Sequence, residues 1–174
     1  MSSPAVIKTA LERNLKAIGA RPSVGQGTAV TKVTLQPGLA CEVEDGPWRF
    51  LVGMTDKYGG ENSGPNPGVY GRAALGSCLA IGYGMWAARL DIPLRSLTVD
   101  VRARYDVRGE LGVDDSIRPG YADIVYVVTV ETDAPDADVQ RLLDTADRHS
   151  SWLDDLRNPV PVSREVRIVR REPA

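Results

Sequence analysis

Histidine and cysteine are scarce in this sequence of 174 residues. His149 is its one histidine, and Cys41 and Cys78 are its two cysteines. A single histidine rules out a zinc site built from several His ligands, and it weakens any Ser-His-Asp or Cys-His arrangement. Two cysteines are also a poor framework for disulfides. Most standard enzyme templates are therefore excluded, and we expect neither a metal nor a cofactor.

The sequence also lacks long runs of like charge and apolar stretches long enough to cross a membrane. The 21 basic and 23 acidic residues are dispersed and give a net charge of -2, which argues against nucleic acid and anionic membranes as partners. The longest apolar stretch, residues 73–88, contains Gly76, Gly82 and Gly84 and is shorter than the ~20 residues that cross a bilayer. The chain does not begin with a basic and then apolar leader, so we expect a cytoplasmic location.

The rest of the composition is typical of one soluble globular domain, with 43% apolar and 25% charged residues. Residues 4–18 have apolar positions at helical spacing, and Pro4 suits a first turn. Gly19 and Pro22 should end this helix. We therefore divide the chain into an N-terminal helical extension, residues 1–26, and a single domain, residues 27–174.

From residue 27 the pattern changes to short strands separated by turns. We expect strands at residues 28–35, 39–44 and 48–54, joined as a meander. Residues 58–68 are too rich in glycine and proline for either regular element. Asn66 and Pro67 then form a good N-cap and first-turn pair for a helix over residues 67–90.

The helix over residues 67–90 is apolar nearly all round and rich in small residues. Such a helix belongs in the middle of a core, and its small residues let a second helix approach closely. Our hypothesis is that this helix is too apolar for one subunit to cover alone. We therefore expect a second copy of the chain to help bury it.

The second half predicts a hairpin of strands at residues 97–107 and 121–131, with one face exposed to water. A helix with Pro135 in its first turn follows, and a last strand is expected at residues 162–169. One face of this helix carries Val139, Leu143, Ala146, Ser150 and Leu153. Adjacent antiparallel strands, without β-α-β alternation, predict the α+β class.

Four segments, taken together, carry a resemblance to a known family. They are GGENSGPNP at residues 59–67, AALGSCLA at 73–80, RYDVRGELG at 104–112 and ADRHS at 146–150. With these segments in this order, the sequence resembles the OsmC/Ohr family over residues 27–169. The resemblance implies an OsmC-like fold, in which antiparallel sheets wrap around long central helices in an intertwined homodimer with active sites at the subunit interface.

The resemblance also implies a reaction. In peroxidatic members a helix cysteine attacks a hydroperoxide, a second cysteine resolves the sulfenic acid, and an Arg and a Glu hold the first thiolate. Cys78 matches the first cysteine, whereas the resolving position falls at Ser150 and the carboxylate at Gly68. The arginine position falls near residues 36–37, which are Gln and Pro. The implied function is a stress protein that reduces organic hydroperoxides through Cys78, with an external thiol as reductant.

Two interpretations of Cys78 remain open. Cys78 lies 11 residues beyond Pro67, ~16 Å along the helix axis, where the dipole of its own helix no longer acts. An activating charge must come from another element or from the partner, and Arg49, Arg102 and Arg104 are candidates. The alternative is that Cys78 is a small buried apolar residue. Ser150, likewise, is either a site residue or a hydroxyl bonded to a carbonyl one turn earlier.

A second function therefore stands beside the first, namely a non-catalytic dimer that binds a small hydrophobic ligand. Trp86 is a candidate wall for its apolar pocket. The candidate binding residues are Glu61, Asn66, Trp86, Arg102 and Arg104.

Overall fold

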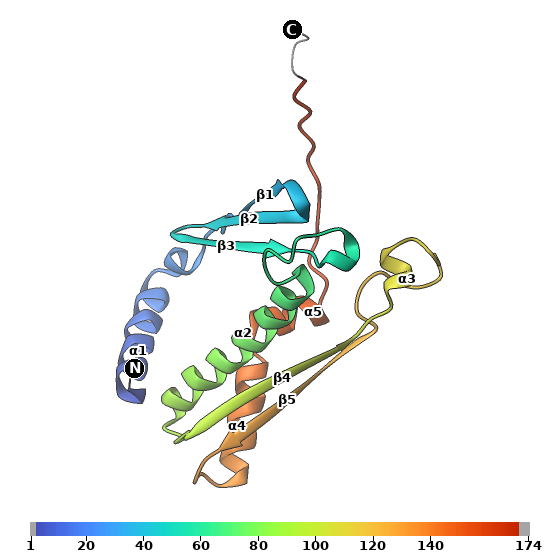
Figure 1. Ribbon diagram of the computed structural model, residues 1–174. Helices are drawn as coiled ribbons and strands as arrows, with labels where there is room; N and C mark the ends of the chain where they lie inside the picture. Colours follow the sequence, from blue (N-terminus) through green and yellow to red (C-terminus); the bar gives the residue numbers. More distant parts are fainter. Residues whose placement is uncertain (1–2, 171–174) are drawn as a thin grey trace.

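The computed structural model describes residues 3–170, and Figure 1 shows their arrangement. The α-helices are α1 Pro4–Ala20, α2 Pro67–Leu90, α3 Val107–Glu110, α4 Asp136–Asp147 and α5 Ser151–Arg157. The strands are β1 Lys32–Gln36, β2 Ala40–Asp45, β3 Trp48–Gly53, β4 Ser96–Arg104 and β5 Asp123–Glu131. Short 3-10 turns, η1 Pro22–Gly25, η2 Pro37–Leu39 and η3 Asp56–Tyr58, complete the list. The predicted α+β class is confirmed.

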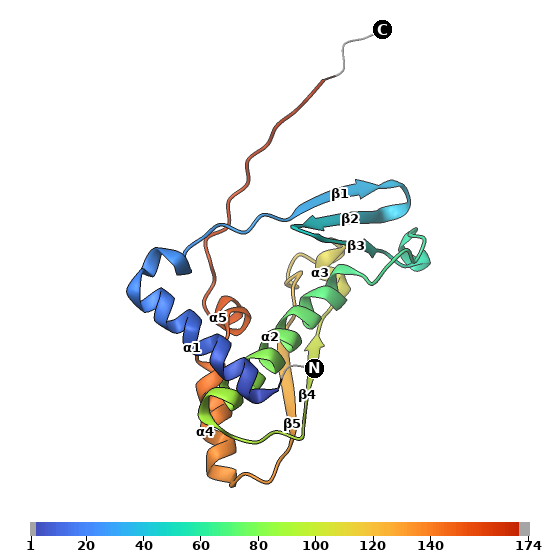
Figure 2. The same cartoon turned by 90° about the vertical axis from the view of Figure 1, so that its left-hand side faces the viewer.

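The strands form two separate antiparallel sheets. The first sheet has the order β1-β2-β3, which is the predicted meander, and the second is the β4-β5 hairpin. Figure 2 shows the first sheet at one end of α2, with the hairpin running along the length of that helix. The predicted alternation in β4 is confirmed, because every second residue from Leu97 to Ala103 is half-buried and the residues between are exposed.

The helix α2 is the element against which the others pack. It begins as predicted, with Asn66 Oδ1 accepting a hydrogen bond from the Val69 N–H at 3.1 Å. Its buried face meets the hairpin, α4 and α5 through a core of Leu75, Leu79, Tyr83, Ala146 and Leu153. A Cβ added to Gly76 would lie 3.2 Å from Val101 Cγ2, so the absence of a side chain there lets α2 approach β4 closely.

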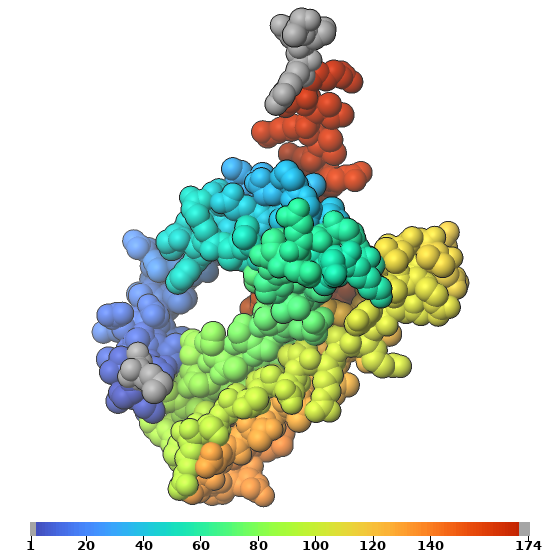
Figure 3. Space-filling view, viewed as in Figure 1, coloured from blue at the N-terminus to red at the C-terminus, as the bar shows by residue number. Residues whose placement is uncertain are grey.

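One chain covers only part of α2. A stripe at four-residue spacing, consisting of Ala73, Ser77, Ile81 and Met85, is exposed, and Ile81 is 63% exposed. Figure 3 shows an opening between α1, the three-stranded sheet and α2. The expectation that α2 lies in the middle of a core is therefore met on one face only. Among the described helices, none is long and apolar enough to cross a membrane.

Three predicted strands differ from the structure. The strand expected over residues 28–35 begins only at Lys32 and ends at Gln36. The strand expected over residues 97–107 ends at Arg104, because the Asp106 carboxylate accepts from the Arg108 N–H at 3.1 Å and starts the turn into α3. The strand expected over residues 162–169 is wrong for the single chain, where this segment is exposed and outside any sheet. A strand requires a neighbouring strand for its N–H and C=O groups, and Figure 1 shows this segment extending away from both sheets.

The helix predicted after Pro135 is divided. The structure ends α4 at Asp147 and begins α5 at Ser151. The apolar spacing continues across the break, so Ala146 and Leu153 still reach the same core. The break is therefore invisible in the hydrophobic pattern, although it places Ser150 in a different conformation from the one expected.

Leu142, on α4, is fully buried (0% exposed) and belongs to a second buried cluster with Ala87 and Ile92, which gives a test of this packing. Leu142→Ala is expected to lower the free energy of unfolding by about 2–5 kcal/mol, because it leaves a cavity in a packed interior. Urea denaturation followed by circular dichroism measures the change. The matched substitution Leu111→Ala, at a side chain that is 56% exposed, should cost less than about 0.5 kcal/mol. Equal losses for the two variants would contradict the packing described here.

Candidate functional site around Cys78

The sulfur of Cys78 lies beside the break between α4 and α5. Cys78 Sγ is 3.4 Å from Ser150 Oγ and 3.7 Å from Ser151 Oγ. These two serines are more than 70 residues away in the sequence, and α2 packs against both α4 and α5. The structure thus brings the predicted pair Cys78 and Ser150 together, and it adds Ser151.

Ser150 is at this position because it begins a helix. Its backbone is extended (φ -82, ψ 113), and its Oγ accepts from the Leu153 N–H at 3.4 Å as the N-cap of α5. A serine hydroxyl has one proton and two lone pairs, so an oxygen that accepts from Leu153 can still donate to a sulfur. The expectation that Ser150 bonds back to a carbonyl one turn earlier is wrong, because the helix is interrupted there. Ser150 is also buried (7% exposed), which keeps its hydroxyl near Cys78.

The surroundings of Cys78 favour its thiolate. Burial raises the pKa of the thiol, whereas hydrogen bonds from the Ser150 hydroxyl and the Trp152 N–H, and from the hydroxyl and N–H of Ser151, lower it. The lowering prevails, so the pKa of Cys78 lies below that of an ordinary cysteine. The first N–H groups of a helix have no partner within that helix, and here those of α5 are directed to the sulfur. Within this chain, the groups that lower the pKa of Cys78 are neutral donors at the start of α5, in place of the charged group expected from the sequence.

The three arginines proposed as activating charges are engaged elsewhere in this chain. Arg49 forms an ion pair with Glu44, and Arg104 forms one with Asp123. Arg102 lies 3.8 Å from Asp100 on the exposed face of the hairpin. Any role of these arginines at Cys78 stays a prediction.

A pocket of about 230 Å³ opens beside Cys78. It is lined by Cys78, Ile81, Gly82, Met85, Trp86, Ala146, His149, Ser150 and Ser151. Its walls are mainly apolar, whereas the polar groups lie along the edge formed by residues 149–151. The pocket matches the predicted place of Trp86, and it puts a nucleophilic sulfur next to a surface that suits an apolar molecule.

Two contacts hold the rings of this pocket in place. The Trp86 and His149 rings lie 4.9 Å apart between centroids, and the Arg89 guanidinium lies 4.5 Å from the centre of the Trp86 ring. His149 Nδ1 is 2.7 Å from the Thr145 carbonyl oxygen. In the neutral ring Nδ1 therefore carries the proton and donates it to Thr145, which leaves Nε2 as the acceptor nitrogen.

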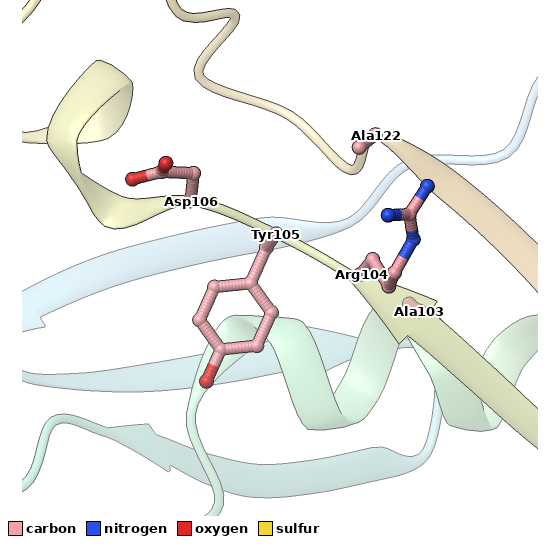
Figure 4. A pocket seen from close by; sticks show the side chains of 5 residues that line it. All are labelled: Ala103, Arg104, Tyr105, Asp106 and Ala122. Atoms are coloured by element: carbon pink, nitrogen blue, oxygen red, sulfur yellow. The ribbon is translucent and has the colours of Figure 1, made fainter.

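The other candidate binding residues lie outside this pocket. Asn66 caps α2, and Glu61 is exposed, with its side chain against Gly38. Arg104 lines a wide, shallow hollow of about 470 Å³ with Ala103, Tyr105, Asp106 and Ala122. Figure 4 shows that the Arg104 and Tyr105 side chains project in different directions there. The structure therefore groups Cys78, Ser150 and Trp86, and does not add Glu61, Asn66 or the arginines.

The loop before α2 fixes where that helix starts. Its Asn62 N–H donates to the Met54 carbonyl at 3.1 Å, and the Gly53 N–H donates to the Pro65 carbonyl at 3.1 Å. A Cβ added to Gly60 would lie only 2.1 Å from the Met54 carbonyl oxygen, so this position requires glycine. The loop is thus attached to the end of β3, and it directs the chain into α2.

Sequence reasoning did not find Ser151, the Trp152 N–H or the pocket position of His149. A usable signal was present, because two serines followed by Asp154 and Asp155 are typical of a helix start. Cys41 lies on β2 and does not line this pocket, and both cysteines are free thiols. Within residues 3–170 no group of three or more His, Cys, Asp or Glu side chains is placed to hold a metal ion.

Comparison with known families identifies the chain. The sequence profile of the OsmC-like protein family matches residues 60–165, which is more than half of the sequence. The chain belongs to the OsmC-like protein family. None of the curated proteins matches this OsmC-like sequence.

Solved structures of the OsmC-like family share the fold. An OsmC-like protein from Mycoplasma pneumoniae has a TM-score of 0.66 at 10% identity, covering 77% of this chain and 90% of that one. An organic hydroperoxide resistance protein from Legionella pneumophila has a TM-score of 0.56 at 16% identity, covering 76% and 90%. One from Elizabethkingia anophelis has a TM-score of 0.57 at 15% identity, covering 77% and 91%. The predicted OsmC-like fold is confirmed.

The hydroxyl of Ser150 gives a test of this OsmC-like site. Ser150→Ala removes a hydrogen bond that lowers the pKa of Cys78, so the pKa should rise and Cys78 should react more slowly with iodoacetamide at pH 7. Mass spectrometry of the Cys78 peptide, over a pH series, measures the rate separately from Cys41. Ser116→Ala is the matched control, because the Ser116 hydroxyl is exposed and donates to the Asp114 carboxylate, away from α2 and α5. An unchanged pH midpoint in Ser150→Ala would contradict the assigned role.

Proposed function

We propose that this protein is a stress protein that reduces organic hydroperoxides through Cys78, using an external thiol as reductant. The observation that carries the proposal is the contact of Cys78 Sγ with the Ser150 and Ser151 hydroxyls at the edge of an apolar pocket. A nucleophilic thiolate and an apolar surface beside it are the two features that such a reaction requires. Membership of the OsmC-like family, with organic hydroperoxide resistance proteins among its structural neighbours, supports the same reaction.

The proposed cycle has two stages. In the first, the Cys78 thiolate attacks the terminal oxygen of the hydroperoxide, the O–O bond breaks, and an S–O bond forms. The alkoxide takes a proton and leaves as the alcohol, and the cysteine becomes a sulfenic acid. In the second, an external thiol attacks the sulfenic sulfur and releases water, giving a mixed disulfide. A second thiol then forms the external disulfide and restores Cys78.

The pocket supports an apolar substrate. Ile81, Met85 and Trp86 line one side of it, so the organic group of a hydroperoxide would lie against these side chains with its oxygens towards Cys78. The role of the second cysteine cannot pass to Ser150, because a hydroxyl forms no disulfide. Cys41, on β2 of the three-stranded sheet, forms no disulfide with Cys78 in this chain. An external reductant is therefore part of the proposal.

We also propose that the working form is an intertwined homodimer. The isolated chain exposes 13522 Å² of surface, whereas a compact monomer of this size exposes about 8,300 Å². The excess, about 5,200 Å² per chain, is larger than the area that each partner of an obligate dimer usually buries, so a second copy has ample surface to cover. The exposed stripe of α2 and the unpaired segment of residues 162–169 are the surfaces that a second copy would cover.

A non-catalytic binding protein is the second candidate function. It is favoured by the apolar walls of the pocket, which would suit a small hydrophobic ligand without any reaction at sulfur. The two functions differ in whether Cys78 is oxidised and reduced again in a catalytic cycle. A peroxidase assay therefore separates them.

The wild-type protein is expected to consume cumene hydroperoxide when a dithiol reductant is present. Cys78→Ser should abolish this consumption, because serine is not a nucleophile at neutral pH, whereas Cys41→Ser should retain it. Loss of hydroperoxide, followed by a ferrous-xylenol orange assay, measures the activity. A wild type that leaves the peroxide untouched, but carries a co-purified apolar molecule in native mass spectrometry, would replace the first function by the second.

Light scattering coupled to size-exclusion chromatography is expected to give the mass of two chains. Ile81→Glu should shift the protein towards a single chain, because it puts a charge in the middle of the exposed α2 stripe. Gln140→Glu adds the same charge on the exposed side of α4 and should leave the mass unchanged. A wild-type mass of one chain at micromolar concentration would refute the dimer.

A further inference from the structure

Asp147, the last residue of α4, connects three elements. Its Oδ1 accepts from the Tyr83 hydroxyl on α2, and its Oδ2 accepts from the Tyr126 hydroxyl on β5, each at 2.6 Å. Tyr83 is buried (1% exposed), and both Tyr126 and Asp147 are half-buried. The reaction proposed above uses none of these three groups. The function of a carboxylate that accepts hydrogen bonds from two tyrosine hydroxyls beside the core therefore needs an explanation.

The Tyr83 and Tyr126 hydroxyls remain hydrogen-bond donors over a wide pH range. Burial, and next the hydrogen bond to Asp147, raise the pKa of Tyr83 far above its ordinary value. The pKa of Tyr126 is raised by the same two causes in the same order. Both hydroxyls therefore stay protonated at neutral and mildly alkaline pH. Hydrogen bonds from neutral donors to a charged acceptor are among the stronger ones in proteins.

The residues that follow Asp147 form the elbow between α4 and α5, defined here as residues 148–150. Its backbone hydrogen bonds are local, since the His149 N–H donates to the Ala146 carbonyl at 3.0 Å and the Ser150 N–H to the Asp147 carbonyl at 3.3 Å. Local bonds fix the shape of the elbow but not its distance from α2. That distance depends on where α4 ends, and Asp147 is the polar group that attaches this end to α2 and β5.

We propose that Asp147 is a positioning residue for Cys78. By holding the end of α4 against Tyr83 and Tyr126, it keeps the Ser150 and Ser151 hydroxyls against the Cys78 sulfur. The inference takes its functional meaning from the proposed role of Cys78 as nucleophile. The chain of contacts runs from β5 and α2, through Asp147 and the elbow, to the sulfur.

The sign of the effect separates positioning from simple electrostatics. A nearby negative charge disfavours a thiolate, so if Asp147 acted mainly through its charge, removing that charge would make Cys78 more reactive. Positioning predicts the opposite, because a loosened elbow withdraws hydrogen-bond donors from the sulfur. A role confined to overall stability would change the unfolding curve and leave the reactivity of Cys78 in the folded protein unchanged.

The experiment is the pH profile of Cys78 alkylation in the full chain, read by mass spectrometry of the Cys78 peptide. In Asp147→Asn the midpoint is expected to move up, and at a pH below both midpoints the rate falls about tenfold for each pH unit of that shift. Tyr126→Phe, which removes one donor hydroxyl from a half-buried ring, should move it less and in the same direction. Asp147→Glu, which restores a carboxylate, should lie between the wild type and Asp147→Asn.

Asp144→Asn is the matched control, because it removes the same charge from an exposed position one turn earlier on α4, and its profile should equal that of the wild type. Faster alkylation, or an unchanged midpoint in Asp147→Asn with a folded circular dichroism spectrum, would overturn the inference. If Asp147→Asn does not fold, an unchanged midpoint in Tyr126→Phe overturns it. A wild type that reduces no hydroperoxide, but responds to these substitutions, would refute only the proposed function.

Discussion

The covering of α2 is the constraint from which the other features follow. A helix that is apolar nearly all round must have neighbours on every side, and this chain supplies them on one face through the hairpin, α4 and α5. The approach to β4 is close at Gly76, where an added Cβ would lie 3.2 Å from Val101 Cγ2. The opposite face, with Ile81 and Met85, is open in the single chain. Both the architecture and the position of the pocket result from this one-sided packing.

The site itself results from an interruption. A continuous helix after Pro135 would use its N–H groups internally, and none would be free to reach a sulfur. By ending α4 at Asp147 and starting α5 at Ser151, the chain places a capping serine and unpaired N–H groups against Cys78. Cys78 lies in the middle of α2, where the dipole of that helix has no effect. The start of α5 gives it the hydrogen-bond donors that a residue at a helix N-terminus normally has.

Much of the fold was predictable because it rests on local signals. Asn66 and Pro67 mark the start of α2, and the alternation along β4 marks a half-buried strand. The family resemblance paired Cys78 with Ser150. The elbow was not predictable from hydrophobic spacing, since the spacing runs through it unchanged, and only the serines and the acidic residues after it mark a new helix. The last predicted strand failed for another reason, because alternation gives the tendency to form a strand while a neighbouring strand must come from elsewhere.

The groups that lower the pKa of Cys78 within this chain are hydroxyls and backbone N–H groups, which are neutral dipoles. Dissolved ions screen fields between separated charges over about 10 Å at 0.1 M salt, but they hardly weaken a hydrogen bond in contact with its acceptor. Within a single chain, the ionisation of this thiol therefore depends on the geometry of the elbow more than on ionic strength. The hydrogen bonds that lower the pKa of this sulfur therefore persist when the salt concentration changes.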